Sequence, residues 1–441
     1  MTARLKISLW EHFRRWVDRE GNRRLLFWLL AGLLLRMLIM PFFCHADFLS
    51  EYRRVYMTIE TGDFFPQYTR LVVYYSELLF LFLSLPILGS PEALLSLTDL
   101  THSTASLLDY YLIVSDPHIF SRLFFLKIPY LLFDLGTAVL IYRMMEGKKT
   151  QLAALNLWLF NPVTLYAFYL FGRYESISIF FLALSLYGMQ KKKIGWAAVA
   201  LGMALNAREI NIIFVPLFFL AVLDDEGDIR RNAARILSTG IIVAGLFFLP
   251  QLLSRLFDIQ PLYRGINAIG TDRSAHIFDF QHKWLLPFVF TYFCICFWLL
   301  ETRGEPFFKM LKAWGLSMLA FFFFTSHSAH YVSWLMIFPV FMLFFRSDML
   351  KPTVLLCCTW VALWLFATDR GVFTPLLASP LSLYFLQVPS VPKLYTQSSW
   401  NEGFFHLDIV ILILNNLFHA GLAYVAYKWI RTSSSETQIV G

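Results

Sequence analysis

Apolar runs that approach the length of a membrane-spanning helix recur along almost the whole of this sequence, and short clusters of lysine and arginine separate them. A helix needs about 20 mostly apolar residues to cross the hydrocarbon core of a bilayer. Only 15% of the residues are charged, whereas soluble domains carry about 25%. The sequence therefore predicts an all-α, polytopic integral membrane protein.

The distribution of charge indicates which partners the chain has. A net charge of +7 would also suit a nucleic-acid-binding protein. Here the basic residues lie between the apolar runs, as the positive-inside rule predicts for cytoplasmic loops. We therefore expect the membrane, and no nucleic acid, as a partner. The cysteines have neither the spacing of a disulfide framework nor that of a metal site, so we expect no metal and no cofactor.

Loops with basic clusters alternate with loops that lack them. This alternation predicts about 12 spans, roughly 11 to 14, with both ends of the chain in the cytoplasm. Several runs are shorter than 20 residues, which implies tilt or local thinning of the bilayer. The expected spans are 25–43, 124–141, 152–171, 177–189, 194–206, 210–223, 236–252, 284–300, 316–325, 332–345, 354–367 and 409–427.

Residues 44–122 are expected to form a large first external loop with juxtamembrane helices. They contain the apolar run 71–88, which is interrupted by polar residues. If that run crossed the membrane, the later basic cluster of Arg143, Lys148 and Lys149 would fall outside. We therefore expect residues 71–88 at the outer interface. The alternative is a second, weak span around residues 107–114.

Polar residues gather at the external ends of the expected spans. Ionisable groups that converge on one membrane face of many helices indicate a substrate site there. These residues are Asp47, Glu51, Arg173, Glu175, Arg208, Glu209, His276, Lys283, His330 and Tyr331.

Each of these stretches also has a purely structural interpretation. Asp47 follows the first span and could simply end that helix in water. Arg208 and Glu209 join two spans almost without a spacer, and could form a structural ion pair. Arg36 lies within the first span, where it must pair or snorkel toward the interface. His327 and His330 are three residues apart, but no third ligand accompanies them, which argues against a metal.

The order of these features resembles the GT-C superfamily of polytopic glycosyltransferases. The resemblance covers roughly residues 25–345, and its elements are ordered on one side of the membrane. They are Asp47 after the first span, a Lys-x-Pro…Asp-Leu segment at residues 125–135, Asn161-Pro162 followed by residues 172–177, the short hairpin at residues 204–209, and residues 328–334.

The resemblance implies a fold and a reaction. A GT-C enzyme transfers a sugar, here expected to be mannose, from a polyprenyl-phosphate donor to a lipid or glycan acceptor by an inverting displacement. The closest branch contains the mannosyltransferases of phosphatidylinositol-mannoside and glycosylphosphatidylinositol synthesis. The chain departs from the family in having one aspartate after the first span, with Glu51 four residues on, where many relatives have two adjacent acids.

The roles implied by the resemblance are assigned residue by residue. Asp47 is the expected general base. The donor phosphate would be bound by Arg208, Lys283 and Arg173. The remaining substrate contacts would come from Glu51, Glu175, Glu209, His276, His330 and Tyr331.

The same resemblance divides the chain into parts. Residues 1–24 would form a cytoplasmic interfacial segment, residues 25–345 the catalytic membrane module, residues 346–431 further helices, and residues 432–441 a disordered tail. The host membrane would be a bacterial plasma membrane or the endoplasmic reticulum, with the site on the non-cytoplasmic side. Two other functions remain open: a polytopic lipid or solute transporter or flippase, and a non-catalytic subunit of a glycosylation complex.

The predicted topology can be tested with a cysteine at position 192, in the basic cluster after the expected span 177–189. A membrane-impermeant maleimide should leave Lys192→Cys unlabelled in intact cells and label it after permeabilisation, because basic loops stay in the cytoplasm. The five native cysteines are replaced beforehand. Labelling from outside intact cells would contradict the topology.

Overall fold

The structure is a computed structural model that describes residues 20–62, 70–91, 114–223, 227–256, 285–325, 327–367, 375–398, 401 and 406–431. The predictions for His276 and Lys283, for the two ends of the chain and for the alternative span around residues 107–114 lie outside the described residues.

All regular elements within these ranges are helical. The first half contains α2 (Glu20–Ile39), α3 (Ala46–Thr61), α4 (Leu71–Leu88), α7 (Ile119–Met144), α8 (Gln151–Leu159), α9 (Pro162–Leu165), the π-helix η1 (Tyr166–Leu170), α10 (Glu175–Gln190), α11 (Ile194–Ala207), η2 (Glu209–Ile213) and α12 (Phe214–Ala221). The second half contains α13 (Ile229–Leu256), α15 (Leu285–Glu301), α16 (Pro306–Phe324), η4 (Ala329–Val332), α17 (Ser333–Met342), η5 (Ser347–Met349), α18 (Leu350–Ala367), η6 (Pro375–Leu381), η7 (Leu383–Leu386), α19 (Val391–Thr396) and α20 (Leu407–Ile430).

Six helices of the described part are long and apolar enough to cross a membrane. They are α4, α7, α16, α20, the stretch Ile229–Leu249 of α13 and the stretch Ser347–Ala367 across η5 and α18. Large apolar side chains such as Leu237 and Phe290 are exposed on the surface, as lipid-facing residues would be. This supports the predicted all-α, membrane-embedded protein.

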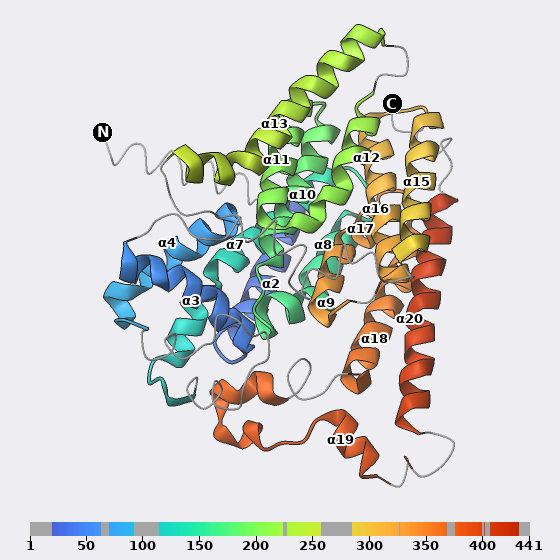
Figure 1. The fold of residues 1–441 in the computed structure, drawn as a ribbon. Coiled ribbons are helices and arrows are strands. Elements are labelled where there is room, and N and C mark those ends of the chain that lie inside the picture. Colours follow the sequence, from blue (N-terminus) through green and yellow to red (C-terminus); the bar gives the residue numbers. More distant parts are fainter. Residues whose placement is uncertain are drawn as a thin grey trace.

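The helices form a bundle with α3 and α4 packed together at one flank and the segment from η6 to α19 beneath one end (Figure 1). Helix α10 packs against both α7 and α11. A Cβ atom on Gly188 would lie 3.0 Å from the backbone nitrogen of Ala197. The glycine thus lets α10 and α11 approach closely.

The expected continuous span 152–171 is broken into α8, α9 and η1. Asn161 caps α9 with its side chain, which accepts a hydrogen bond from the backbone N–H of Val163, and Pro162 takes the first helical position. The π-helix η1 follows at once. Such π-helical turns are frequent at functional sites, and this one leads directly to Arg173.

A buried polar network lies in the bundle beneath these breaks. The fully buried Arg36 on α2 donates from Nε to the carboxylate of Asp134 on α7, at 2.6 Å. Trp158 and Tyr169 donate to the same carboxylate at 2.8 Å and 2.7 Å. Arg36 is therefore paired rather than snorkelling, and the pair ties α2, α7, α8 and η1 together.

Removing one partner of this pair should be costly. Asp134→Leu leaves the Arg36 guanidinium buried without its counter-charge, which costs about 3–5 kcal/mol. The double variant Asp134→Leu with Arg36→Met should recover much of that loss, since it leaves no isolated charge. Unfolding in detergent measures both variants, and a cost of Asp134→Leu below about 1 kcal/mol would contradict the assigned pairing.

Candidate functional site

Asp47 lies in the first turn of α3, where the chain leaves α2. The imidazole of His45 caps this helix, and its Nδ1 accepts a hydrogen bond from the Asp47 backbone N–H at 3.1 Å. The same nitrogen lies 3.4 Å from Oδ1 of Asp47. The helix N-terminus favours a negative charge there. The Asp47 carboxylate is thus fixed by its own helix, yet 21% of its side chain is exposed.

Segments distant in sequence hold this helix start in place. The backbone N–H of Cys44 donates to the carbonyl of Leu377 in η6, at 2.9 Å. That of His45 donates to the carbonyl of Phe171, at 3.2 Å. Leu377, which lies between the expected spans 354–367 and 409–427, is therefore directly beside the start of α3.

Gly172 allows the segment after η1 to pack against α3. Its φ of 85° is in the left-handed region, and a Cβ atom would lie 3.0 Å from the ring of Phe48. Arg173 follows, and its Nη1 lies 3.8 Å from Oδ2 of Asp47 and 3.6 Å from Oε1 of Glu51. The glycine thus brings the guanidinium of Arg173 against the acidic face of α3.

Glu175 and Arg208 form the buried base of the site. Arg208 donates to both carboxylate oxygens of Glu175, from Nε at 2.9 Å and from Nη2. The indole N–H of Trp334 donates to the same carboxylate at 2.5 Å. The Arg208 guanidinium also lies over the rings of Tyr174, at 4.6 Å, and Tyr331, at 5.5 Å. Three separate stretches of the sequence meet at this pair.

Two further arginines form the more exposed rim. Arg54 lies 3.1 Å from Oε2 of Glu51. Arg70, at the start of α4, donates to Glu209 at 3.2 Å and also to the hydroxyl of Tyr174. The Arg70 and Glu209 side chains are 27% and 37% exposed. The cluster therefore grades from a fully buried base to a rim that water can reach.

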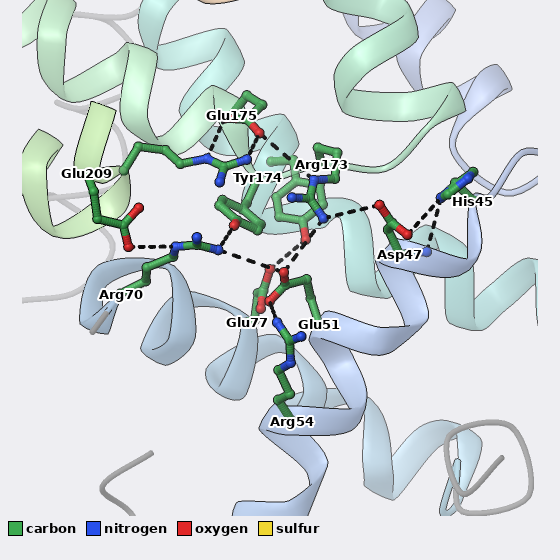
Figure 2. Close-up of polar contacts among 12 residues, drawn as sticks. His45, Asp47, Glu51, Arg54, Arg70, Glu77, Arg173, Tyr174, Glu175 and Glu209 are labelled. Atoms are coloured by element: carbon green, nitrogen blue, oxygen red, sulfur yellow. Dashed lines mark hydrogen bonds and ion pairs between the residues drawn. The ribbon is translucent and has the colours of Figure 1, made fainter. Parts of the chain in front are cut away.

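Figure 2 shows the cluster as a chain of alternating charges. Four carboxylates, of Asp47, Glu51, Glu175 and Glu209, face four guanidinium groups, of Arg54, Arg70, Arg173 and Arg208. The charges of these described residues therefore balance, which lowers the cost of burying them.

Arg173 is bound less tightly than its neighbours. Its carboxylate partners are 3.6–3.9 Å away, beyond the usual length of a hydrogen bond. Its buried Nε has no hydrogen-bond partner among the described residues. A buried guanidinium in this state retains the capacity to bind an anion.

A stack of three rings stands beside Arg173. His45 stacks on Phe171 with 4.0 Å between ring centroids, and His330 also stacks on Phe171, at 4.5 Å. Both ring nitrogens of His330 are buried without a hydrogen-bond partner in the described part of the chain. Burial, together with the charges of Arg173 and Arg208, holds the pKa of His330 well below its usual value. A neutral imidazole can both donate and accept.

The acids of α3 remain ionised in this setting. Burial alone would raise the pKa of Asp47, but His45, Arg173 and Arg54 outweigh it, so the pKa is below its usual value. For Glu51 burial is likewise outweighed, by Arg54, Arg173, Arg70 and Arg208, and its pKa is also lowered. At neutral pH both groups are therefore carboxylates.

The structure brings most of the predicted site residues into one cluster. These are Asp47, Glu51, Arg173, Glu175, Arg208, Glu209, His330 and Tyr331. Sequence reasoning gave no role to His45, Arg54, Arg70 or Trp334. Arg70 immediately precedes the apolar run 71–88, so its place at a membrane boundary was a usable signal. No group of three potential metal ligands occurs among the described residues.

Comparisons of the chain with protein families, with characterised proteins and with solved structures found no match. The chemistry of the cluster is set by its own groups: a partly exposed carboxylate, a guanidinium without close partners and a neutral imidazole.

Proposed function

We propose that this chain is a membrane glycosyltransferase of the GT-C type. It moves a sugar, with mannose as the expected one, from a polyprenyl-phosphate donor to a lipid-linked or glycan acceptor on the non-cytoplasmic face. The observation that carries the proposal is the pairing of Asp47 with Arg173, 3.8 Å apart. It combines a base for the acceptor with a cation for the leaving group, in a bundle of membrane-length helices.

The proposed reaction is an inverting single displacement. The acceptor oxygen attacks the anomeric carbon of the donor while the carboxylate of Asp47 takes the hydroxyl proton. The bond between that carbon and the phosphate oxygen breaks, and the lipid phosphate leaves with the bonding electrons. The proton passes from Asp47 to water, which its partly exposed side chain allows.

Among the described residues, Arg173 is the best placed to bind the donor phosphate. We expected Arg208 and Lys283 to bind it first, with Arg173 as a third candidate. Arg208 already makes two hydrogen bonds to Glu175, so its charge is paired inside the protein. Arg173 lacks such bonds at Nε. A phosphate within its reach would gain charge-assisted hydrogen bonds and stabilise the leaving group.

Donor binding would also strengthen the base. Arg173 is one of the groups that hold the pKa of Asp47 below its usual value. The monoanionic phosphodiester of the donor, bound to Arg173, would offset that charge, and the pKa of Asp47 would rise. Asp47 would therefore become a better proton acceptor when the donor is present.

The remaining groups are suited to sugar and acceptor hydroxyls. His330 is neutral and unpartnered at both ring nitrogens among the described residues. Glu51 and Glu209 stand nearer the exposed rim, and Tyr331 lies beside His330. Carboxylates accept hydrogen bonds from hydroxyl groups, whereas imidazole can donate as well. We assign these residues to orienting the substrates.

The proposed function also implies how the helices and the site lie relative to the membrane. About 12 helices would span the bilayer. Helices α3 and α4 would belong to the first external loop beside it, although α4 is also long and apolar enough to cross. The site would then open to the non-cytoplasmic side of a bacterial plasma membrane or the endoplasmic reticulum, where the polyprenyl tail stays in lipid. Residues 25–345 would form the catalytic module.

A panel of radiolabelled polyprenyl-phosphate sugars tests the proposed function. The purified protein in nanodiscs is supplied with each donor and with a lipid extract as acceptor. We expect transfer from one donor, with release of one polyprenyl phosphate for each sugar transferred. Movement of an intact donor across the bilayer, without breakage of its sugar–phosphate bond, would favour a flippase instead.

Asp47→Asn should reduce turnover about 10²- to 10⁴-fold, because the amide keeps the shape of the side chain but cannot accept the proton. Binding of the donor and folding should persist. Glu51→Gln is the matched control, one helical turn further along α3, and should be much milder. Turnover is measured at saturating donor and acceptor. Near-normal turnover of Asp47→Asn would place the base elsewhere.

A further inference from the structure

We propose that Lys127 is a positioning residue that sets the spacing between Asp47 and Arg173. Its ammonium group binds the two chain segments that carry these residues. The catalytic role of Lys127 rests on the proposed function, whereas its structural role rests on the geometry alone.

The contacts of Lys127 account for all of its donors. It lies on α7, and it is fully buried. Its Nζ donates to the carbonyls of Met40, at 2.9 Å, and Phe43, both just after α2. It also donates to the carbonyl of Tyr169 in η1, at 2.8 Å. An ammonium group has three hydrogens, so the side chain is saturated by backbone carbonyls.

These carbonyls would otherwise be difficult to satisfy. Met40 and Phe43 lie between the end of α2 and the start of α3, outside the hydrogen-bond ladder of either helix. A cation at this position also complements the negative end of the α2 dipole. Lys127 therefore adds side-chain hydrogen bonds to a turn that already has the backbone bond from the Phe42 N–H to the Ile39 carbonyl.

In each of the two segments that Lys127 binds, the functional residue lies the same number of positions after the bound carbonyl. Phe43 is followed four residues later by Asp47, and Tyr169 is followed four residues later by Arg173. Between these ends the segments are joined again by the bond from His45 N–H to the Phe171 carbonyl at 3.2 Å. The stacked rings of the same two residues add a third link. A single side chain thus anchors both arms of the site.

Loss of Lys127 would affect catalysis by changing the distance between Asp47 and Arg173. Asp47 and Arg173 are 3.8 Å apart, and the cation lowers the pKa of the carboxyl. Without the clamp the two segments would separate, and a shift of about 1 Å at the reacting groups can cost about 10²-fold in rate. The pKa of Asp47 would rise, because Arg173, which together with His45 holds it below its usual value, would lie further away.

Cys44 offers a readout that needs no activity. It lies between Phe43 and His45, it is fully buried, and burial raises the pKa of its thiol to about 12. Such a thiol reacts slowly with alkylating reagents. In a background without the other four cysteines, Lys127→Met should raise the rate of Cys44 alkylation by about tenfold or more, since local opening exposes it.

Lys309→Met is the matched control, because Lys309 is also a buried lysine, on α16. It should leave Cys44 alkylation near the wild-type rate. Lys127→Gln keeps two of the donors, and it should fall between Lys127→Met and the wild type, which covers the case in which Lys127→Met does not fold. Equal alkylation in the wild type, Lys127→Gln and any folded Lys127→Met would overturn the proposal, as would an equal increase in Lys309→Met.

The catalytic part is read from the pH dependence of kcat/KM. Asp47 must be ionised to act, so activity is lost as pH falls through its pKa. Lys127→Gln should lower kcat and move this acid limb to higher pH, whereas Lys309→Met should leave it in place. A lower rate with an unchanged acid limb would show a general loss of structure and contradict the positioning role. If the wild type has no transfer activity, the alkylation result still decides whether Lys127 holds the turn.

Discussion

The fully buried ion pair between Glu175 and Arg208 is the interaction on which the site depends. Neither charge could lie in this apolar bundle alone, because an unpaired buried charge costs several kcal/mol. Glu175 begins α10, and Arg208 follows α11. Their pairing therefore fixes two helix ends against each other, and the bond from Trp334 adds α17. The ring of Tyr174 packs at this junction, with the Arg208 guanidinium 4.6 Å from its centroid.

The other charged side chains of the cluster pair with one another around the Glu175–Arg208 ion pair. Arg70 and Arg54 hold Glu209 and Glu51 at the rim. Arg173 is left with longer contacts to several carboxylates and an unsatisfied Nε among the described residues. Its neighbours attract it without binding it closely. An incoming phosphate can therefore compete for this guanidinium at lower cost than for Arg208, which would have to abandon Glu175.

The sequence was most informative about which end of its helix each polar residue occupies, and least informative about which residues pair with one another. Alternating basic clusters and apolar runs placed Asp47, Arg173, Arg208 and His330 at one set of helix ends, and the structure brings them together. The pairing of Arg36 with Asp134, 98 positions apart, has no local signature, since either residue alone suits several environments. Asn161-Pro162 has the residue types of a helix cap, but from the apolar run we predicted one continuous span, 152–171, across it.

The exposed rim of the cluster gives a second example of a contact that the sequence does not predict. Arg70 looked like a boundary residue of a run expected at the membrane interface, and nothing local links it to Glu209, 139 positions away. Only the packing of α3, α4 and α11 makes that contact. The roles of Lys283 and His276 stay predictions, because both lie outside the described residues.

In the proposed mechanism, Arg173 is the guanidinium that binds the lipid phosphate. Binding of polyprenyl phosphate to the protein in nanodiscs, measured for the wild type, Arg173→Gln and Arg54→Gln, tests this role. We expect saturable binding that weakens by about tenfold or more in Arg173→Gln, as expected for the loss of charge-assisted hydrogen bonds of about 1.5–3 kcal/mol, and that changes little in Arg54→Gln. Equal affinity of the wild type and Arg173→Gln would show that Arg173 does not bind the phosphate.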